Sequence, residues 1–210
     1  MSLTKKFESA LTSGQRRRFL SLTTPEKIQD FLDEIEYFEE DTYRCPLTTM
    51  RTGKGTCFEG ALVAAAAFSR LGHKPLIITL IASDDDDHVL ALYKKNGDWG
   101  AVAKSRYPGL RSRQPVYRTL RELAMSYFEF YFNHRAKRTL RKYSIPLSLT
   151  RFDAENWREK DETVAAISDA LDATRHMRLV SPLQGNRLPK VDKWLFRTET
   201  HDSARKRSRP

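Results

Sequence analysis

Apolar residues follow two different patterns in the first third of the chain, and each pattern predicts a helix. Across residues 25–37 they recur every three or four positions, which predicts an amphipathic helix with one face on the core. Thr23 or Thr24 as the N-cap, with Pro25 at the first helical position, is typical of a helix start. Across residues 61–68 nearly every position is apolar, so this second helix is expected to be buried on most sides.

A β-hairpin is predicted after the second helix. Residues 74–81 form an apolar, β-branched run that is typical of an inner strand. Two further strand-like runs, residues 88–93 and 99–104, flank the pair Asn96-Gly97. Asparagine followed by glycine accepts the positive φ angles of a type I′ turn, so these two runs are expected to pair as antiparallel neighbours.

This hairpin also predicts which residues face each other. If the Asn-Gly pair is the loop, Lys95 pairs with Asp98, and the same register sets Ser105 opposite His88. Because side chains alternate along a strand, Asp86 is expected on the same face as His88.

The remaining chain is expected to complete one domain. Helical spacing of apolar residues predicts further helices over residues 117–132 and 155–174. We expect the domain to span residues 23–199, with a basic N-terminal arm over residues 1–22, either a short helix or frayed, and a disordered basic tail over residues 200–210.

Composition narrows the class of protein. A chain that is 40% hydrophobic and 30% charged is typical of a globular protein. No apolar run approaches the length of a membrane span, and no apolar segment of a secretory signal follows the basic residues near the N-terminus. The chain has only two cysteines, so a disulfide framework is not expected. We therefore expect a cytoplasmic location. We expect no cofactor and no bound metal.

The cysteine at the start of the Ala-rich helix is the candidate nucleophile. Cys57 is expected in the first helical turn, where unpaired N–H groups and the helix dipole favour an anion. They should lower the pKa of the thiol, so a thiolate is expected at neutral pH. His88 is the candidate base, because imidazole titrates in the required range. The competing interpretation is that Cys57 is only a small core residue.

A family resemblance joins these features. Residues 55–61 on a helix, followed by a strand and by His88 at the start of a hairpin whose return strand begins at Trp99, resemble the transglutaminase-like branch of the papain-like cysteine fold. Residues 84–88 and 117–128 look similar to uncharacterised bacterial transglutaminase-like proteins. The resemblance implies an α+β fold in which a central Cys-bearing helix packs on an antiparallel β-sheet, with additional C-terminal helices. It also implies the cysteine as nucleophile and the histidine as base.

Two catalytic positions depart from the family pattern. The aspartate expected on the return strand is Ala103 here, so Asp86 and Ser105 are the candidates to orient the imidazole instead. The glutamine expected ahead of the nucleophile, an oxyanion-hole donor, is replaced by Arg51. Other possible donors are the main-chain N–H of Cys57 and the side chains of Thr49, Arg51 or Thr56.

Two functions from different classes fit these features. The first is a peptide or amide hydrolase or acyltransferase that acts through a Cys57 thioester with His88 as base. Its substrate would be a peptide or protein amide, and the acidic residues 84–87 would favour cationic or amine-bearing groups at the rim of the site. The second is a catalytically inactive domain that binds an anionic partner such as nucleic acid. Residues 104–142, with 11 Lys and Arg against 2 Glu, would form its binding region.

Overall fold

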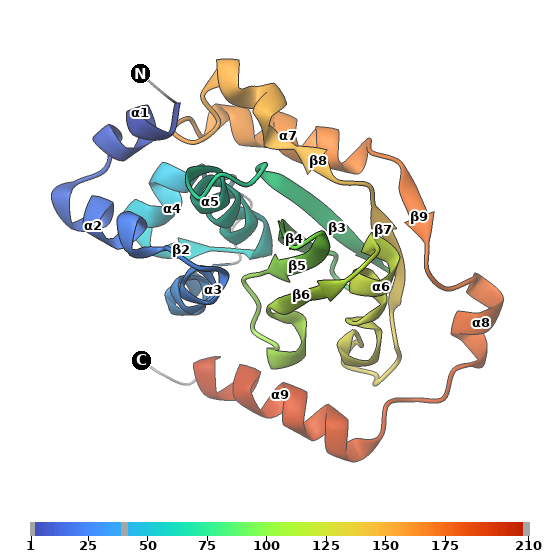
Figure 1. The fold of residues 1–210 in the computed structure, drawn as a ribbon. Helices are drawn as coiled ribbons and strands as arrows, with labels where there is room; N and C mark the ends of the chain where they lie inside the picture. Colours follow the sequence, from blue (N-terminus) through green and yellow to red (C-terminus); the bar gives the residue numbers. More distant parts are fainter. Residues whose placement is uncertain (1–2, 39–41, 208–210) are drawn as a thin grey trace.

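Helix α5 (Cys57–Arg70) lies against one face of an antiparallel β-sheet, as Figure 1 shows. The computed structural model describes the backbone of residues 3–38 and 42–207 and the side chains of residues 5–38 and 42–200. The strands of this sheet are β3 (Leu76–Ala82), β4 (His88–Lys95), β5 (Asp98–Val102), β6 (Arg113–Tyr117), β7 (Leu140–Ser144), β8 (Leu147–Ser148) and β9 (His176–Arg178). Their order is β6-β5-β4-β3-β7-β9, and β8 pairs with β3. The prediction of an α+β fold with an antiparallel sheet is confirmed.

The other elements surround the sheet. Strands β1 (Glu36–Tyr37) and β2 (Lys54–Gly55) form a separate parallel pair. The other α-helices are α1 (Leu3–Ala10), α2 (Ser13–Ser21), α3 (Pro25–Glu34), α4 (Pro46–Thr52), α6 (Leu120–Met125), α7 (Glu162–Asp172), α8 (Pro182–Arg187) and α9 (Lys193–Arg207). The described residues also contain the short 3₁₀ helices η1 (Pro108–Leu110), η2 (Phe128–Phe130) and η3 (Leu149–Glu155). Within the described residues, none of the helices has the length and apolar character of a membrane span.

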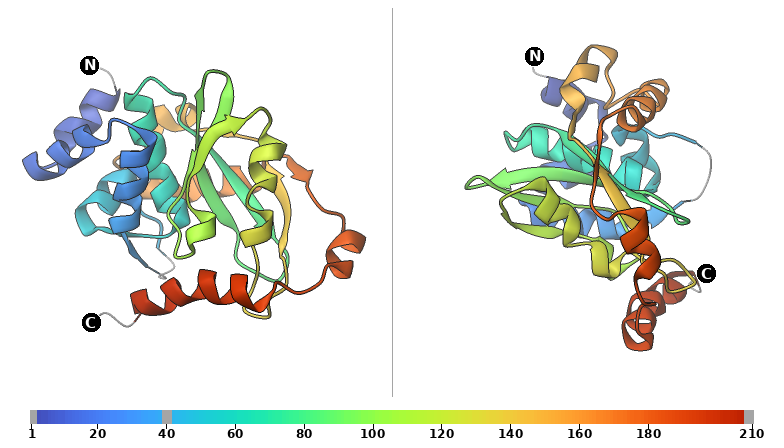
Figure 2. Two further views of the ribbon diagram at one scale, coloured as in Figure 1. Left: turned by 60° about the horizontal axis from the view of Figure 1, so that its bottom comes forward. Right: turned by 90° about the vertical axis from the view of Figure 1, so that its right-hand side faces the viewer.

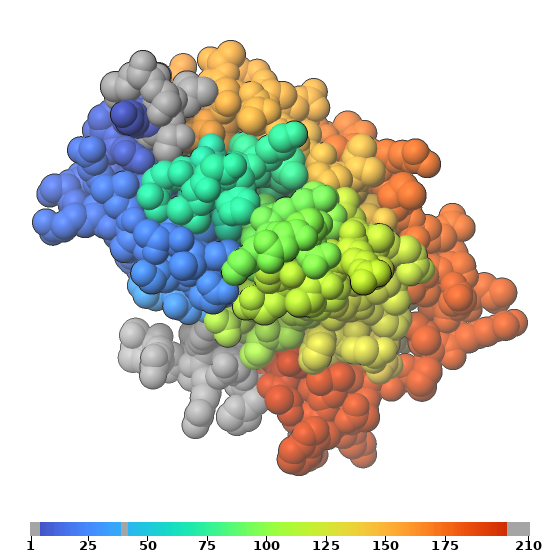
Figure 3. Space-filling view, viewed as in Figure 1, coloured from blue at the N-terminus to red at the C-terminus, as the bar shows by residue number. Residues whose placement is uncertain are grey.

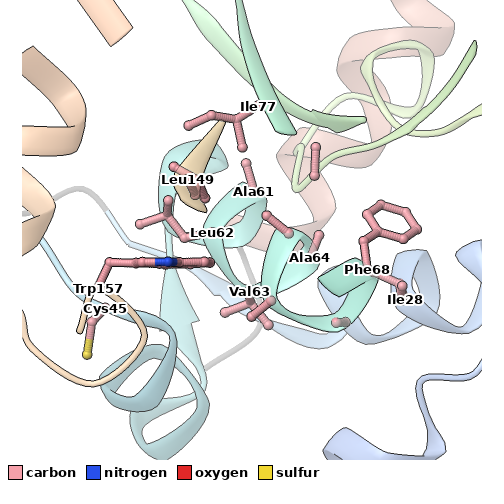
Figure 4. Close-up of a cluster of buried hydrophobic side chains, with 14 of the residues drawn as sticks. Ile28, Cys45, Ala61, Leu62, Val63, Ala64, Phe68, Ile77, Leu149 and Trp157 are labelled. Carbon is pink, nitrogen blue, oxygen red and sulfur yellow. The ribbon is translucent and has the colours of Figure 1, made fainter. Parts of the chain in front are cut away.

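The sheet separates two cores. Ile77 of β3 points to the α5 side, where the core also contains Leu62 and Phe68 of the helix and Trp157 beyond it (Figure 4). The neighbouring Ile78 points to the opposite side, which is covered by α6 and η2. This alternation follows from the period of two along a strand. Helix α5 is buried almost all round, as its uninterrupted apolar sequence predicts.

The predicted hairpin register is confirmed over most of its length. Asn96 and Gly97 have φ angles of 53° and 91°, as a type I′ turn requires. The ladder between β4 and β5 runs from the Lys95–Asp98 pair to the pair of Ala91 with Val102. Strand β5 ends there, before Ser105, so the expected cross-strand pairing of Ser105 with His88 lies beyond the ladder.

The helix predicted over residues 117–132 is wrong. Strand β6 ends at Tyr117, and Thr119 then starts the short helix α6 by accepting a hydrogen bond from the N–H of Glu122 at 3.1 Å. Ser126 ends α6, where its hydroxyl donates to the Leu123 carbonyl at 2.6 Å. Local side-chain bonds therefore cut an apolar helical pattern into shorter pieces.

Two other predicted helices are shorter than expected. The helix predicted over residues 25–37 ends at Glu34, because the chain turns into β1, where the Glu36 N–H donates to the Gly53 carbonyl at 2.8 Å. The helix predicted over residues 155–174 begins only at Glu162. Asn156, with a φ of 61°, is left-handed and interrupts the helical course.

Both ends of the chain contain helices. Within residues 1–22, Phe7 and Phe19 are fully buried, and their rings meet edge to face with centroids 5.1 Å apart. The N-terminal helices therefore belong to the core on the α5 side, and the space-filling view shows the dark blue segment beside the teal residues of the middle of the chain (Figure 3). Residues 200–207 of the expected disordered tail continue helix α9, and residues 208–210 lie outside the described residues.

Candidate active site

Cys57 is the first residue of helix α5. Thr56 caps the helix, since its hydroxyl accepts a hydrogen bond from the N–H of Phe58 at 3.2 Å. The Glu59 carboxylate accepts from the N–H of Thr56 at 2.9 Å and also from its hydroxyl. This capping box was visible in the sequence as a threonine followed three residues later by a glutamate, and our sequence analysis missed it. The capping box fixes the first residue of the helix and so the position of the Cys57 side chain.

One cavity of about 310 Å³ contains all four residues proposed for the site. Cys57 comes from α5, Asp86 from the β3–β4 connection and His88 from the start of β4, and Ser105 follows β5. The cavity is also lined by Tyr131, whose hydroxyl donates to the Asp86 carbonyl at 2.6 Å. Residues far apart in the sequence therefore line one cavity together with Cys57.

The pKa of Cys57 is raised, whereas the helix start was expected to lower it. The residue is partly exposed, but the surrounding protein desolvates the thiol, which raises its pKa to about 11. Main-chain N–H groups, that of Val89 foremost, act in the opposite direction, and the charge of Glu59 adds to the increase. Desolvation outweighs the helix terminus here, so the thiol is neutral at pH 7. Its hydrogen-bond partner is the carbonyl oxygen of Asp87, at 3.9 Å.

His88 is buried and held by the main chain. Its Nε2 lies 2.9 Å from the carbonyl oxygen of Leu110. Because a carbonyl only accepts, Nε2 carries the proton, and the neutral ring keeps a lone pair on Nδ1. Burial lowers the pKa of His88 to about 4; the Leu110 bond opposes this shift and the charge of Arg113 supports it. Within the described residues, no hydrogen bond joins the imidazole to the thiol.

Leu110 is a site residue that sequence reasoning missed. It lies in the 3₁₀ turn η1, and its main-chain carbonyl oxygen accepts the hydrogen bond from the imidazole. A main-chain acceptor leaves no signal in the residue type, so no motif search could have found it. Ser105 and Asp86 were the two side chains suggested to orient the imidazole, and both lie in other environments. The Ser105 hydroxyl accepts from the N–H of Tyr107 at 3.0 Å, and the Asp86 side chain is exposed.

Ala103, at the position of the expected aspartate, is held by a glutamine. The Gln29 side chain accepts from the Ala103 N–H and donates to the Ala103 carbonyl, both at 3.0 Å. The next residue, Lys104, is also buried and lines the cavity, and its ammonium group donates to the Ile35 carbonyl. Helix α3 and the residue after it thus fix the segment that leads from β5 to the site.

The oxyanion-hole candidates are spread over several environments. Arg51 is exposed on α4, and the Thr56 hydroxyl is engaged in the helix cap. Thr49 is buried, and its hydroxyl lacks a hydrogen-bond partner within the described residues. The main-chain N–H of Cys57 remains a candidate donor, because the first N–H groups of a helix have no partner inside the helix.

The acidic loop between β3 and β4 is tied to the protein. Asp87 accepts from the N–H of Ala82 at 2.8 Å, and Asp85 accepts from the Thr139 hydroxyl at 2.6 Å. Burial raises the pKa of both carboxyl groups. Within residues 5–38 and 42–200, no group of three or more His, Cys, Asp or Glu side chains is arranged to hold a metal ion.

The basic side chains of residues 104–142 do not form one continuous helix face. Arg111 pairs with Asp33, and Arg138 pairs with Glu129 at 2.7 Å. Arg113 lies over the Tyr127 ring, 3.8 Å from its centroid. Several positive charges of this region are therefore engaged in contacts within the domain.

Comparison with known proteins gives a distant structural similarity. Three structures of Legionella pneumophila LapG each match 50% of this chain with a TM-score of 0.36. One is 16% identical to this chain and is covered over 73% of its own length. The EGTA-treated and calcium-bound forms are both 17% identical and are covered over 70% and 72%. No family model and no curated protein matches the chain.

Proposed function

We propose that this protein is a transglutaminase-like thiol enzyme that hydrolyses or transfers acyl groups through a Cys57 thioester. The carrying observation is that Cys57 and His88 line one cavity, while the Leu110 carbonyl holds the imidazole in one tautomer. That tautomer keeps the lone pair of Nδ1, which a general base needs.

The reaction starts from neutral partners. A thiol with a pKa of about 11 and an imidazole with a pKa of about 4 do not form a resting ion pair. His88 therefore takes the thiol proton as the Cys57 sulfur bonds to the acyl carbon. Collapse breaks the bond to the leaving group, and His88 returns the proton to that group. Water or an amine then attacks the thioester and regenerates the thiol; hydrolysis is favoured because water is always present.

The proposed substrate is a peptide or protein amide. Asp85, Asp86 and Asp87 line one part of the cavity and favour a cationic or amine-bearing group there. The aromatic rings of Tyr107 and Phe130 line another part, which suits an extended peptide with apolar side chains. The alternative, an inactive domain that binds nucleic acid through residues 104–142, is less well supported because part of that charge is already paired.

An activated ester tests the proposal without knowledge of the natural substrate. Treatment with p-nitrophenyl acetate should acetylate Cys57, which peptide mapping by mass spectrometry detects as a thioester. Cys45→Ala is the matched control: burial also raises the pKa of Cys45 to about 11, but that residue does not line the cavity. The proposal requires that acylation is lost in Cys57→Ala, is strongly slowed in His88→Ala and persists in Cys45→Ala. Equal acylation of wild type and His88→Ala would overturn it.

A further inference from the structure

We propose that Glu199, on the C-terminal helix α9, is a positioning residue for His88. This inference rests on the proposed function. Glu199 is only 5% exposed, and its Oε2 accepts a hydrogen bond from the Gly109 N–H at 2.7 Å. Gly109 directly precedes Leu110, whose carbonyl holds the imidazole. A carboxylate near the C-terminus is thus joined to the candidate base through one turn of main chain.

The turn is held from two sides. On one side the Gly109 N–H donates to Glu199, and on the other the Gly109 carbonyl accepts from the Arg113 guanidinium at 2.7 Å. The turn also packs closely: a Cβ on Gly109 would lie 2.5 Å from the Phe130 Cβ. Loss of the Glu199 contact removes one of the two hydrogen bonds at Gly109 that hold this closely packed turn. The Leu110 carbonyl can then move away from Nε2, and the tautomer of His88 is no longer fixed.

Helix α9 is itself fixed against the same part of the domain. Its Phe196 ring packs on Phe132, which lines the cavity, with centroids 5.7 Å apart. The segment before α9 is held by the Val191 N–H, which donates to the Ala136 carbonyl at 2.8 Å. Figure 2 shows α9 in red, running along the edge of the domain beside the green segment that follows β5.

A buried carboxylate is a costly way to hold a surface turn. Removing its charge from water disfavours folding unless the hydrogen bonds it makes compensate. A charged acceptor forms a stronger hydrogen bond to a main-chain N–H than a neutral one. The hydrogen bond from Gly109 to Glu199 therefore holds the turn in one conformation. Because the Leu110 carbonyl belongs to that turn, the orientation of the His88 ring is held as well. Glu199 does not touch the reacting atoms, so its effect is on geometry alone.

The test compares Glu199→Ala and Glu199→Gln for the rate of Cys57 acetylation by p-nitrophenyl acetate. Glutamine keeps an oxygen acceptor for the Gly109 N–H, and alanine does not. We expect Glu199→Ala to slow acetylation by about 10–100-fold, the effect of a small misplacement of a catalytic group. Glu199→Gln should stay close to wild type. Arg197→Ala, at an exposed position of the same helix, is the matched control and should leave the rate unchanged.

A second readout separates positioning from a general loss of structure. Long-range ¹H–¹⁵N spectra report which nitrogen of His88 is protonated, and Glu199→Ala should convert a single Nε2–H tautomer into a mixture. In a His88→Ala background, Glu199→Ala should have no further effect on the rate. If Glu199→Ala does not fold, Glu199→Asp, which retracts the carboxylate by one methylene, should give the same loss in a folded chain.

The possible failures are distinguishable. If His88→Ala slows acetylation but neither Glu199→Ala nor Glu199→Asp does, the positioning role is wrong and the proposed function stands. If Glu199→Ala slows acetylation equally with and without His88, its role is structural only and the inference is also overturned. If His88→Ala itself has no effect, the proposed function fails first.

Discussion

The imidazole of His88 donates to the main-chain carbonyl of Leu110 at 2.9 Å, although the two residues lie on opposite sides of a hairpin in the sequence. In a Ser-His-Asp triad a carboxylate accepts this hydrogen bond from the histidine. Here the acceptor is a main-chain carbonyl, and the return strand has Ala103 where the family resemblance implies an aspartate. A carbonyl fixes the tautomer as well as a carboxylate does, but it does not supply a full charge to stabilise the imidazolium. Burial therefore lowers the pKa of His88 to about 4, although the Leu110 bond opposes that shift.

The stability of the protein should depend on pH through His88. Its pKa is lowered from 6.5 to about 4, so between these values the unfolded chain binds a proton that the folded protein does not. Stability should therefore be complete above pH 6.5 and decrease as the pH falls toward 4, by about 3 kcal/mol for this group. Urea unfolding at pH 7 and pH 4 measures the change. His88→Gln, which keeps a donor for Leu110, should lack this component, and an identical pH dependence in both proteins would contradict the assignment.

Gln29 is a polar side chain that should contribute strongly to the stability of the folded protein. Replacement by leucine leaves the N–H and the carbonyl of Ala103 without their partners in a buried position. Each orphaned group costs about 1–3 kcal/mol, so the free energy of unfolding should fall by roughly 2 kcal/mol or more. Gln114→Leu, at an exposed glutamine, should change it by less than about 0.5 kcal/mol. Equal effects of the two substitutions would show that the contacts to Ala103 are not important.

Gly60 should be required for the close approach of α5 to the segment after β5. A Cβ at this position would lie 2.5 Å from the Cβ of Lys104, closer than real side chains come. Gly60→Ala should therefore destabilise the protein by about 1–3 kcal/mol, despite the higher helix propensity of alanine. Gly14→Ala is the matched control in helix α2, where a Cβ meets nothing within 4 Å. It should stabilise the protein by up to about 1 kcal/mol. Thermal unfolding of both variants provides the comparison, and stabilisation by both would contradict the packing argument.

The sequence was sufficient for the elements with strong local signals. The Asn96-Gly97 turn and the apolar run of α5 were predicted correctly because turn chemistry and helix burial are local properties. The helix expected over residues 117–132 failed for the opposite reason. Its apolar spacing was compatible with a helix, but Thr119 and Ser126 bond to nearby main chain and divide the segment.

Electrostatic properties of the site could not be read from the sequence. The position of Cys57 at a helix start was predicted correctly. The predicted lowering of its pKa was wrong, because desolvation depends on the tertiary packing around the thiol. The roles of Leu110 and Glu199 could not be predicted from the sequence for a related reason. One contributes a main-chain atom, and the other reaches Gly109 from a helix far along the chain.

The most direct test of the account is the pH dependence of Cys57 acetylation by p-nitrophenyl acetate in wild type and His88→Ala. If His88 is the base, the wild-type rate should rise with the ionisation of a group of pKa about 4 and then stay level through neutral pH. His88→Ala should lower that plateau by about 100-fold or more and leave a rate that rises only toward pH 11, with the thiol itself. A wild-type rate that follows thiol ionisation alone, with the same profile in His88→Ala, would contradict the pairing of Cys57 with His88.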